Sequence, residues 1–341
     1  MDEILVVGCG LSGVVIARQL AQAGYKIHII DKRSHIGGNV YDQVNEKGIR
    51  VHHYGPHLFH TKNEKVFKYL QQFGEWVPYK HKVKAMLQDG RYVTLPVNRE
   101  TKDIVGEENI VETFFRPYSE KMWDMKLEEL NPDILNRVPV RDDDNTYYFP
   151  NDPFQAMPKD GYTAIVKNII NHPNIRISLE SPFQKSMEEH ARHIFNAMPI
   201  DEYYDYRYGE LPYRSVKFHT INLPMPKLLP VTTVNFTHKG PHTRVTEWKN
   251  IPAHGENNQF TTLTYEEPCD YKDNNNERFY PVKDLQGTNR ELYKKYQAIP
   301  NEKTTFIGRL GLYIYIDMDQ AVNAALKTAE RFLQKQKKLD Q

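Results

Sequence analysis

The chain of 341 residues exceeds the usual length of one domain, so we expect two or three domains. Its hydrophobic fraction of 39% indicates a globular protein, and its net charge of +1 excludes the strong basic field of a nucleic-acid-binding protein. The two cysteines provide no disulfide framework, which indicates a cytoplasmic location, and no apolar stretch has the length that a membrane span requires.

The N-terminal residues follow the order of a nucleotide-binding strand–helix–strand unit. A wholly apolar strand is predicted at residues 4–7 and a second apolar strand at residues 27–30, and a helix between them extends to about Ala23. Three glycines in G-x-G-x-x-G spacing precede the helix, where they allow a tight turn and place the helix N-terminus against a pyrophosphate. Asp31 ends the second strand, where an acid binds ribose hydroxyls. A glycine-rich turn without a ligand would not explain this acid, so we predict a dinucleotide site.

The residues that follow Asp31 indicate which dinucleotide is bound. Residues 31–39 (DKRSHIGGN) resemble the extension of FAD-binding flavoproteins of the glutathione-reductase and amine-oxidase type. In those proteins a second pair of glycines, here Gly37 and Gly38, lets the chain pass close to the phosphates and the ribityl chain of the cofactor. Nicotinamide-only dehydrogenases usually lack this pair, so we predict FAD.

Residues 53–61 (HYGPHLFHT) contain a dense group of histidines, which raises the question of a metal site. No carboxylate or cysteine with ligand spacing lies beside them in the sequence, so we predict that the chain holds no metal.

Three further elements complete the pattern along the chain. Residues 83–87 and 91–95 alternate in polarity on either side of an Asp-Gly turn, which predicts a β-hairpin of an antiparallel sheet. Residues 194–197 are typical of a strand near mid-chain. From about Asp319, apolar residues recur at helical spacing, which predicts a C-terminal helix that packs on the core.

These elements predict an α/β fold with a discontinuous Rossmann-like FAD-binding domain, a small helical domain and an antiparallel β-sheet domain. The FAD-binding domain is expected to comprise residues 1–76, 186–212 and 300–341. The small helical substrate domain is expected at residues 97–137. The antiparallel sheet and substrate-covering region is expected to comprise residues 77–96, 138–185 and 213–299.

Five stretches, in chain order, are similar to segments of UDP-galactopyranose mutases. They are residues 53–61, residues 114–123 (FFRPYSEKMW), residues 136–141 (NRVPVR), residues 279–282 (FYPV) and residues 308–318 (GRLGLYIYIDM). Each stretch alone is weak evidence, but the joint match covers almost the whole chain. The chain therefore resembles the UDP-galactopyranose mutase family.

The resemblance implies a flavin-dependent mutase that interconverts the pyranose and furanose forms of a nucleotide sugar, above all UDP-galactose. In the family, N5 of reduced flavin attacks the anomeric carbon and displaces UDP, the sugar ring opens and recloses, and UDP returns without net redox. The resemblance thus implies FAD in its reduced form, a nucleotide-sugar substrate and an unspecified reductant such as NAD(P)H. It also implies a role in the synthesis of bacterial surface glycans.

The resemblance also implies a role for individual residues. His57 and His60 lie in the loop that positions the flavin, and Arg137 and Arg244 match the arginines that clamp the diphosphate. The implied substrate-binding residues are Phe114, Tyr118, Trp123, Tyr148, Arg214, Asn235, Glu266, Tyr280 and Tyr315. The implied cofactor-binding residues are Gly8, Gly10, Leu11, Ser12, Gly13, Asp31, Lys32, Gly38, Asn39, His57, Arg309, Asp317 and Met318.

Several alternatives stay open at this point. Tyr118 and Trp123 are alternatively core residues, and Arg214 is alternatively part of a structural ion pair. The segment that leads to Phe114 is shorter than in family members, so neither a homodimer nor the selectivity for the nucleotide follows from the resemblance.

The substrate and the reaction have alternatives too. UDP-N-acetylgalactosamine and dTDP-fucose are alternatives to UDP-galactose. An FAD-dependent oxidase or desaturase shares the cofactor motif, although the arginines and tyrosines favour an anionic substrate. A non-catalytic FAD-binding scaffold is a third alternative.

Overall fold

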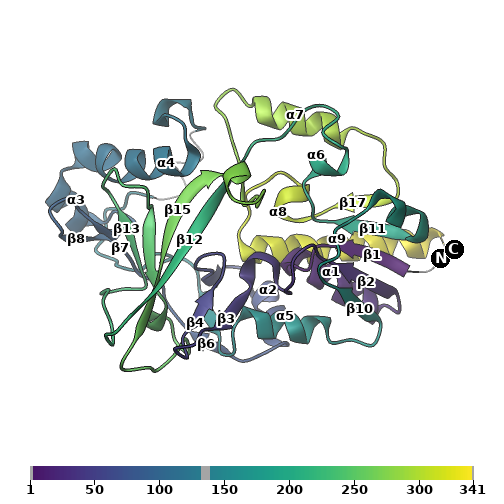
Figure 1. The fold of residues 1–341 in the computed structure, drawn as a ribbon, viewed down its shortest axis with the longest axis horizontal. Coiled ribbons are helices and arrows are strands. Elements are labelled where there is room, and N and C mark those ends of the chain that lie inside the picture. Colours follow the sequence, from purple (N-terminus) through teal and green to yellow (C-terminus); the bar gives the residue numbers. More distant parts are fainter. Residues whose placement is uncertain (1–2, 132–138, 340–341) are drawn as a thin grey trace.

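The computed structural model describes residues 3–131 and 139–339 of the chain. Figure 1 shows two bodies of regular structure, a parallel sheet with its helices and an antiparallel sheet with short helices beside it. In the described ranges, no helix combines the length and the apolar composition that crossing a membrane would require. The observed mixture of parallel and antiparallel sheets confirms the predicted α/β class.

A five-stranded parallel sheet has the strand order β10-β2-β1-β11-β17. Its strands are β1 (Glu3–Val7), β2 (Lys26–Ile30), β10 (Ile175–Ser178), β11 (His193–Asn196) and β17 (Thr304–Phe306). Helix α1 (Leu11–Gln22) follows β1, and the C-terminal helix α9 (Met318–Leu339) packs along it. The predicted strand–helix–strand unit and the C-terminal helix are therefore confirmed.

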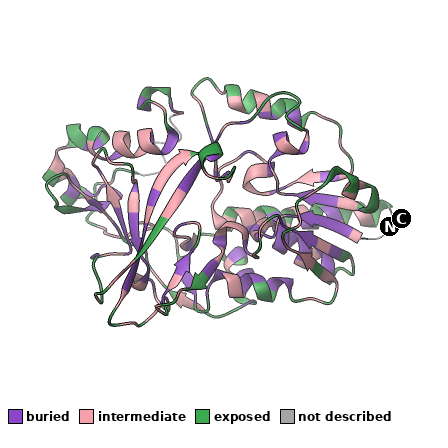
Figure 2. Cartoon of the chain, viewed as in Figure 1, coloured by how far each residue is buried: buried purple, intermediate pink, exposed green. Residues whose placement is uncertain are grey.

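Strand β1 shows why this sheet is buried on both faces. Ile4 and Val6 pack into the cluster that holds the inner faces of α1 and α9, including Leu20 and Ala325. Leu5 packs on the opposite face with other apolar side chains. Successive strand residues point to opposite faces of the sheet, and both faces are covered by apolar side chains. A strand in this position therefore packs well only if all of its residues are apolar. Figure 2 shows the central strand β1 as buried along nearly its whole length.

Part of residues 138–185 lies in the parallel sheet, and its assignment to the antiparallel region is therefore wrong. Strand β10 pairs with β2, and helix α5 (Tyr162–Ile170) packs against α1. The apolar side chains Ile165 and Ile169 recur at helical spacing and join the same core cluster as α1. This burial ties the segment to the parallel sheet.

The antiparallel body is a seven-stranded sheet with the order β16-β12-β15-β14-β13-β7-β8. Its strands are β7 (Val83–Met86), β8 (Tyr92–Leu95), β12 (Tyr213–Leu223), β13 (Thr233–Phe236), β14 (Arg244–Glu247), β15 (Thr261–Asp270) and β16 (Tyr280–Pro281). Strands β7 and β8 form the predicted hairpin, although β13 pairs with β7 in parallel. Strands β12 and β15 are the longest pair and cross the middle of Figure 1.

Short elements connect the two sheets. The remaining strands are β3 (Asp42–Val44), β4 (Arg50–His52), β5 (Phe59–Thr61), β6 (Trp76–Pro78) and β9 (Phe154–Pro158). The remaining α-helices are α2 (Glu64–Gln71), α3 (Arg99–Val105), α4 (Arg116–Trp123), α6 (Ile200–Tyr203), α7 (Thr288–Gln297) and α8 (Gly308–Gly311). Helices α3 and α4 lie at the end of the antiparallel sheet, within the expected small helical region.

Candidate active site

A single cavity at the carboxyl edge of the parallel sheet is lined by every residue for which the sequence predicts a cofactor contact. These residues are Gly8, Gly10, Leu11, Ser12, Gly13, Asp31, Lys32, Gly38, Asn39, His57, Arg309, Asp317 and Met318. They come from the turn after β1, the turn after β2, the histidine-rich loop, helix α8 and the start of α9. The fold thus brings five separate parts of the chain to one place.

The glycines are required by close packing of the backbone around this cavity. A Cβ on Gly13 would lie 2.0 Å from the carbonyl oxygen of Gly8, and a Cβ on Gly38 would lie 2.8 Å from Cα of Gly10. Gly8 and Gly38 also have positive φ angles, +104° and +55°. Helix α1 begins directly after Gly10 with no side-chain cap, so its first amides are available to a bound anion.

Asp31 is buried at the end of β2, and its carboxylate accepts hydrogen bonds from the backbone amides of Cys9 (2.7 Å) and Arg33 (2.9 Å). These bonds join the two turns that form the cradle. Arg33 extends the network, because its guanidinium donates to Asn39 (2.9 Å) and forms an ion pair with Glu277. Arg33 and Glu277 line the cavity but were not predicted; Arg33 lies inside the FAD-type motif, whereas nothing in the sequence indicates Glu277.

The histidine-rich loop is held by a chain of hydrogen bonds that determines which ring nitrogens carry protons. The backbone amide of His57 donates to Nδ1 of His52 (3.1 Å), so a neutral His52 carries its proton on Nε2. That nitrogen lies 2.9 Å from Nε2 of His254, whose Nδ1 in turn lies 2.9 Å from the carbonyl oxygen of Pro252. Burial lowers the pKa of His254 to about 4 and holds that of His52 well below its ordinary value. Both rings are therefore neutral.

His57 borders the cavity as a neutral imidazole. Its Nδ1 donates to the carbonyl oxygen of Gly55 (2.9 Å), which leaves Nε2 as an acceptor. Burial lowers its pKa to about 4, and the positive charges of Arg309 and Arg244 lower it as well, whereas the bond to Gly55 raises it. His60, by contrast, does not line the cavity: its Nδ1 contacts Asp152 at 2.6 Å.

Three of the predicted substrate-binding residues form one row across the antiparallel sheet. Asn235 pairs with Arg244, and Arg244 pairs with Glu266. Nε of Arg244 lies 2.8 Å from Oε1 of Glu266, but the geometry of this ion pair leaves both buried atoms without a hydrogen bond. Burial opposes the charge of Arg244, yet Glu266 and the neighbouring tyrosines raise its pKa well above the ordinary value. The row therefore contains a permanently charged guanidinium, that of Arg244, whose Nε lacks a hydrogen bond.

Tyrosines of α4 and β16 lie close enough to this cation to raise its pKa. Tyr118 lies on α4, and burial raises its pKa to about 12 although Arg244 lowers it. Tyr280 of β16 stacks on Tyr315, with ring centroids 5.3 Å apart. The guanidinium of Arg309 lies 5.2 Å from the ring centroid of Tyr280 and 4.9 Å from that of Tyr315. Since Arg309 also lines the cofactor cavity, the cavity and the arginine–tyrosine cluster share a border.

Helix α4, which carries Tyr118, is attached to the antiparallel sheet by two cations. Arg214 donates through Nε to the carbonyl oxygen of Met122 (2.9 Å), near the end of the helix. Nζ of Lys121 donates to carbonyl oxygens of the β13–β14 loop, including that of His242 (2.8 Å). Arg214 therefore has a structural role, and a direct contact with substrate stays a prediction. Lys121 was not predicted, and no local pattern indicates it.

Two predicted aromatic residues fill apolar cores. Trp123 packs with Met122 and Val216, and Phe114 packs with Val83, while each aromatic side chain is 8% exposed. The core alternative for Trp123 is therefore what the structure shows. Both rings present little surface to a base.

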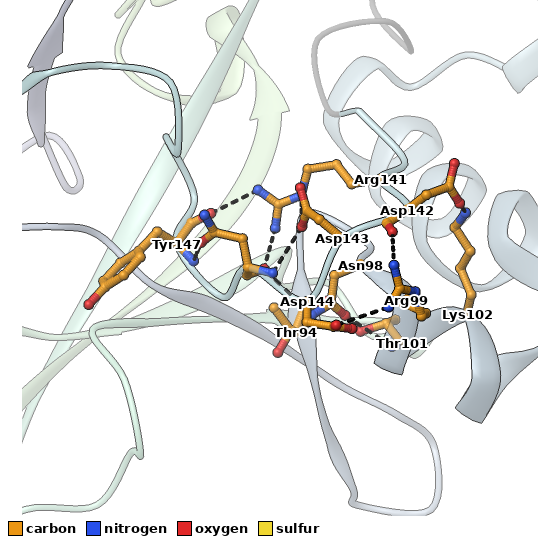
Figure 3. A network of polar contacts seen from close by, with 11 residues as sticks. Thr94, Asn98, Arg99, Thr101, Lys102, Arg141, Asp142, Asp143, Asp144 and Tyr147 are labelled. Carbon is orange, nitrogen blue, oxygen red and sulfur yellow. Dashed lines mark hydrogen bonds and ion pairs between the residues drawn. The ribbon is translucent and has the colours of Figure 1, made fainter.

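The polar network in Figure 3 holds the segment that leads to Tyr148. The guanidinium of Arg141 donates to the carbonyl oxygens of Asn145 (2.6 Å) and Tyr147 (3.0 Å), and Arg99 of α3 pairs with Asp144 (3.0 Å). The backbone amide of Tyr148 then donates to the carbonyl oxygen of His81 (2.8 Å). This network fixes residues 141–147 on α3. Arg137 lies outside the described residues, so its predicted role stays a prediction.

The fold and this site define a class of enzyme with a Rossmann-like dinucleotide-binding domain whose cofactor cavity borders a half-buried arginine–tyrosine cluster. A family model described as an NAD(P)-binding Rossmann-like domain matches residues 6–73, and the model of UDP-galactopyranose mutase matches residues 113–315. The second match covers more than half of the chain. The chain belongs to the UDP-galactopyranose mutase family, so it is an isomerase of the nucleotide-sugar mutase class.

Individual relatives agree with this assignment. The chain is 37% identical to a probable UDP-galactopyranose mutase of Klebsiella pneumoniae, over 97% of this chain and 94% of that protein. It is 34% identical to the dTDP-fucopyranose mutase of Escherichia coli, over 99% of this chain and 100% of that protein. A crystal structure of reduced UDP-galactopyranose mutase shares the fold with a TM-score of 0.77 at 15% identity, over 98% of this chain and 96% of that chain.

Proposed function

We propose that the protein interconverts the pyranose and furanose forms of UDP-galactose, with reduced FAD as cofactor and an unspecified reductant, such as NAD(P)H, as the source of electrons. The observation that carries this proposal is the half-buried Arg244 beside the cofactor cavity, whose Nε is buried without a hydrogen bond. A guanidinium in that setting suits a diphosphate, which is the leaving group of a nucleotide sugar. We further propose that the enzyme acts in the cytoplasm, on a precursor of surface glycans.

The residues around the cavity fit FAD. The uncapped amides at the start of α1 suit the pyrophosphate, and the glycine contacts let the backbone approach it closely. Asp31 uses two of its roughly four acceptor sites on the backbone, so it retains acceptor capacity for a ribose hydroxyl. Reduced FAD, when bound, supplies the nucleophile for the anomeric carbon without net redox.

Arg244 is the residue to which we assign the diphosphate. In the described part of the chain its two Nη groups have no hydrogen-bond partner, and Glu266 holds the side chain from one side only. Each charge-assisted hydrogen bond to a phosphate oxygen contributes about 1.5–3 kcal/mol. By holding the diphosphate after it leaves, Arg244 keeps the group within reach of the sugar for the return step. Arg137 is proposed as its counterpart.

The tyrosines and His57 complete the substrate site in this proposal. The hydroxyls of Tyr118 and Tyr280 have no hydrogen-bond partner in the described ranges, so they are free to donate to phosphate or sugar oxygens. Neutral His57 offers Nε2 as an acceptor at the border of the cavity. Burial disfavours the ionised form of each of these groups, which suits them to hydrogen bonding rather than proton transfer.

One observation favours a second substrate. The Escherichia coli relative is a dTDP-fucopyranose mutase, and its identity to this chain is close to that of the Klebsiella protein. Both substrates are nucleotide diphosphate sugars, so the same arginine would serve either one. dTDP-fucose is therefore the second candidate substrate.

A substrate panel tests the proposal. The purified protein is reduced with dithionite under anaerobic conditions and incubated with the furanose forms of UDP-galactose, UDP-N-acetylgalactosamine and dTDP-fucose, and the pyranose products are separated by chromatography. We expect the fastest conversion with UDP-galactofuranose and none with the oxidised protein. Faster conversion of dTDP-fucofuranose would replace the proposed substrate and keep the reaction.

Two further outcomes would overturn the reaction itself. Oxygen consumption with an amine substrate and no conversion of any nucleotide sugar would indicate an oxidase. Protein that is purified without a flavin spectrum and does not bind added FAD would remove the cofactor from the proposal.

A further inference from the structure

Two histidines and a glutamate meet on the antiparallel sheet, away from the site described above. His219 lies on β12, Glu267 lies on β15, and His242 lies in the loop between β13 and β14. Nε2 of His219 is 2.7 Å from Oε2 of Glu267, and one ligand atom from each of the three residues lies within 4.8 Å of the others. In the described part of the chain, this is the only such cluster of three.

We propose that His219, His242 and Glu267 form a binding site for a divalent transition-metal ion, with zinc as the best-matched ion. Zinc is commonly held by imidazole nitrogen at about 2.0–2.1 Å and by carboxylate oxygen at about 2.0–2.2 Å. Three protein ligands with one water complete its preferred tetrahedron. The ion is bound by neutral imidazoles, and burial together with neighbouring positive charges lowers the pKa of His242.

The distances are compatible with a small adjustment of side chains. Ligand atoms about 2.0–2.1 Å from a tetrahedral ion lie about 3.3–3.4 Å apart. When zinc binds, the distance between Nε2 of His219 and Oε2 of Glu267 would therefore lengthen. The longer distances among the three ligand atoms would shorten. Both side chains have room for this, because they are 48% and 33% exposed. The imidazole ring of His242 contacts the ring of Tyr265, which pairs with His219. The His242 ring therefore lies on the face of the sheet that carries His219 and Glu267.

The backbone beneath the cluster is well supported. His219 pairs with Tyr265 and Glu267 pairs with Lys217, so the two ligands are diagonal neighbours on the longest strand pair of the sheet. The loop that carries His242 is held by Lys121, which donates to the carbonyl oxygen of His242. A site on such elements needs little ordering of the chain when the ion binds.

Two lysines and the active-site carboxylate define the surroundings of the cluster. Lys217 lies opposite Glu267 on β12, and Lys121 lies behind the His242 loop, so both reduce the affinity for a cation. Glu266 and Glu267 are consecutive residues of β15 and therefore point to opposite faces of the sheet. The proposed metal site thus lies behind the Arg244–Glu266 pair, and its occupancy does not require nucleotide sugar.

The sequence does not reveal this site, and the proposal departs from the expectation that the chain holds no metal. The three ligands are separated by 23 and 25 residues, which is unlike the short spacings of known zinc motifs. They meet because β12 and β15 pair in a particular register. In the histidine-rich loop, which raised the question of a metal, Nδ1 of His57 instead bonds to Gly55 and Nδ1 of His60 contacts Asp152.

Zinc binding to the purified full-length protein tests the proposal. The protein is treated with EDTA, exchanged into metal-free buffer at pH 7.5 and titrated with zinc chloride against a chromophoric chelator. His242→Ala and Glu267→Gln each remove one ligand, and His190→Ala removes an exposed histidine from a distant segment as a control. We expect one zinc ion per chain in the wild type and in His190→Ala, and at least about a tenfold weaker affinity in the two ligand variants.

Thermal unfolding provides a second readout that separates a folding defect from a loss of ligands. Zinc should raise the Tm of the wild type and of His190→Ala but not that of His242→Ala, while all three should have similar Tm values without metal. Equal zinc affinity in all variants, or no zinc bound by the wild type, would overturn the proposal. Neither measurement uses substrate, so the result is independent of the proposed reaction.

Discussion

Replacing Arg244 by alanine should separate its catalytic role from its structural role. The wild-type guanidinium has two Nη groups with no hydrogen-bond partner in the described ranges. If each makes one charge-assisted hydrogen bond to the diphosphate, their loss removes about 3 kcal/mol or more. This corresponds to roughly a hundredfold or greater decrease in kcat/KM. Arg244→Lys keeps the charge but loses the planar fork, so we expect a decrease of about tenfold.

The same substitution should also destabilise the fold. Glu266 has a side chain that is 5% exposed and would remain as a buried charge without a partner. Removal of one partner of a buried ion pair costs about 3–5 kcal/mol, and we expect the lower end because the side chain of Arg244 is 26% exposed. The double variant Arg244→Ala, Glu266→Gln removes the stranded charge. We expect it to recover most of the stability and none of the activity.

Both effects are measured on the dithionite-reduced protein. Turnover of UDP-galactofuranose is followed by chromatography, UDP affinity by calorimetry, and the free energy of unfolding by urea titration. An Arg244→Ala protein that is folded, binds UDP as the wild type does and keeps wild-type kcat/KM would refute the assignment of the diphosphate to Arg244.

Three other predictions concern the cofactor turn, helix α4 and acid stability. Gly38→Ala should lose most of its FAD on purification, because the added methyl group meets Gly10, whereas Gly48→Ala adds a methyl group at positive φ into open space and should keep its flavin absorbance. Lys121→Met should raise KM for the nucleotide sugar by about tenfold with a smaller change in kcat, because α4 loses its attachment to the β13–β14 loop; unchanged kinetics would exclude this positioning role. Burial lowers the pKa of His81 to about 3, so the unfolded chain takes up a proton below pH about 6.5 that the folded chain refuses until pH about 3. The Tm measured by circular dichroism should therefore fall as the pH is lowered from 7 to 4.5, and His81→Gln should make this decrease shallower.

The cofactor site was predictable because its residues are local in sequence. The glycines and Asp31 lie within one strand–helix–strand unit, whose backbone geometry permits few other residues. The hydrophobic pattern of β1 and α1 likewise determines which faces are buried. Arg309 and Met318 were found only through resemblance, because nothing in their own segment indicates a cofactor.

The substrate side was less predictable because it depends on pairing between distant strands. Asn235, Arg244 and Glu266 form a row only in the observed register, and a shift by one residue would turn each side chain to the other face. The role of Arg214 in capping α4 arises from a contact across 92 residues. A local pattern contains no information about such contacts.

Composition also gives no sign of which aromatic residues are buried. Trp123 occurs in a segment that resembles the family, but the side chain fills the core beneath α4. Strand β10 was misassigned for a related reason: its short pattern fits either sheet, and only the packing of α5 against α1 determines which sheet it joins.

The order of strands in the parallel sheet has a consequence for how the protein is made. Its central strand β1 (Glu3–Val7) precedes its neighbour β11 and the edge strand β17, which come from residues 193–196 and 304–306, by long stretches of chain. During translation, one edge of β1 therefore stays unpaired until β11 has left the ribosome. A chain that ends before β17 would thus form an incomplete sheet with an exposed, unpaired strand edge. Chaperones bind such exposed edges and the apolar surface beside them.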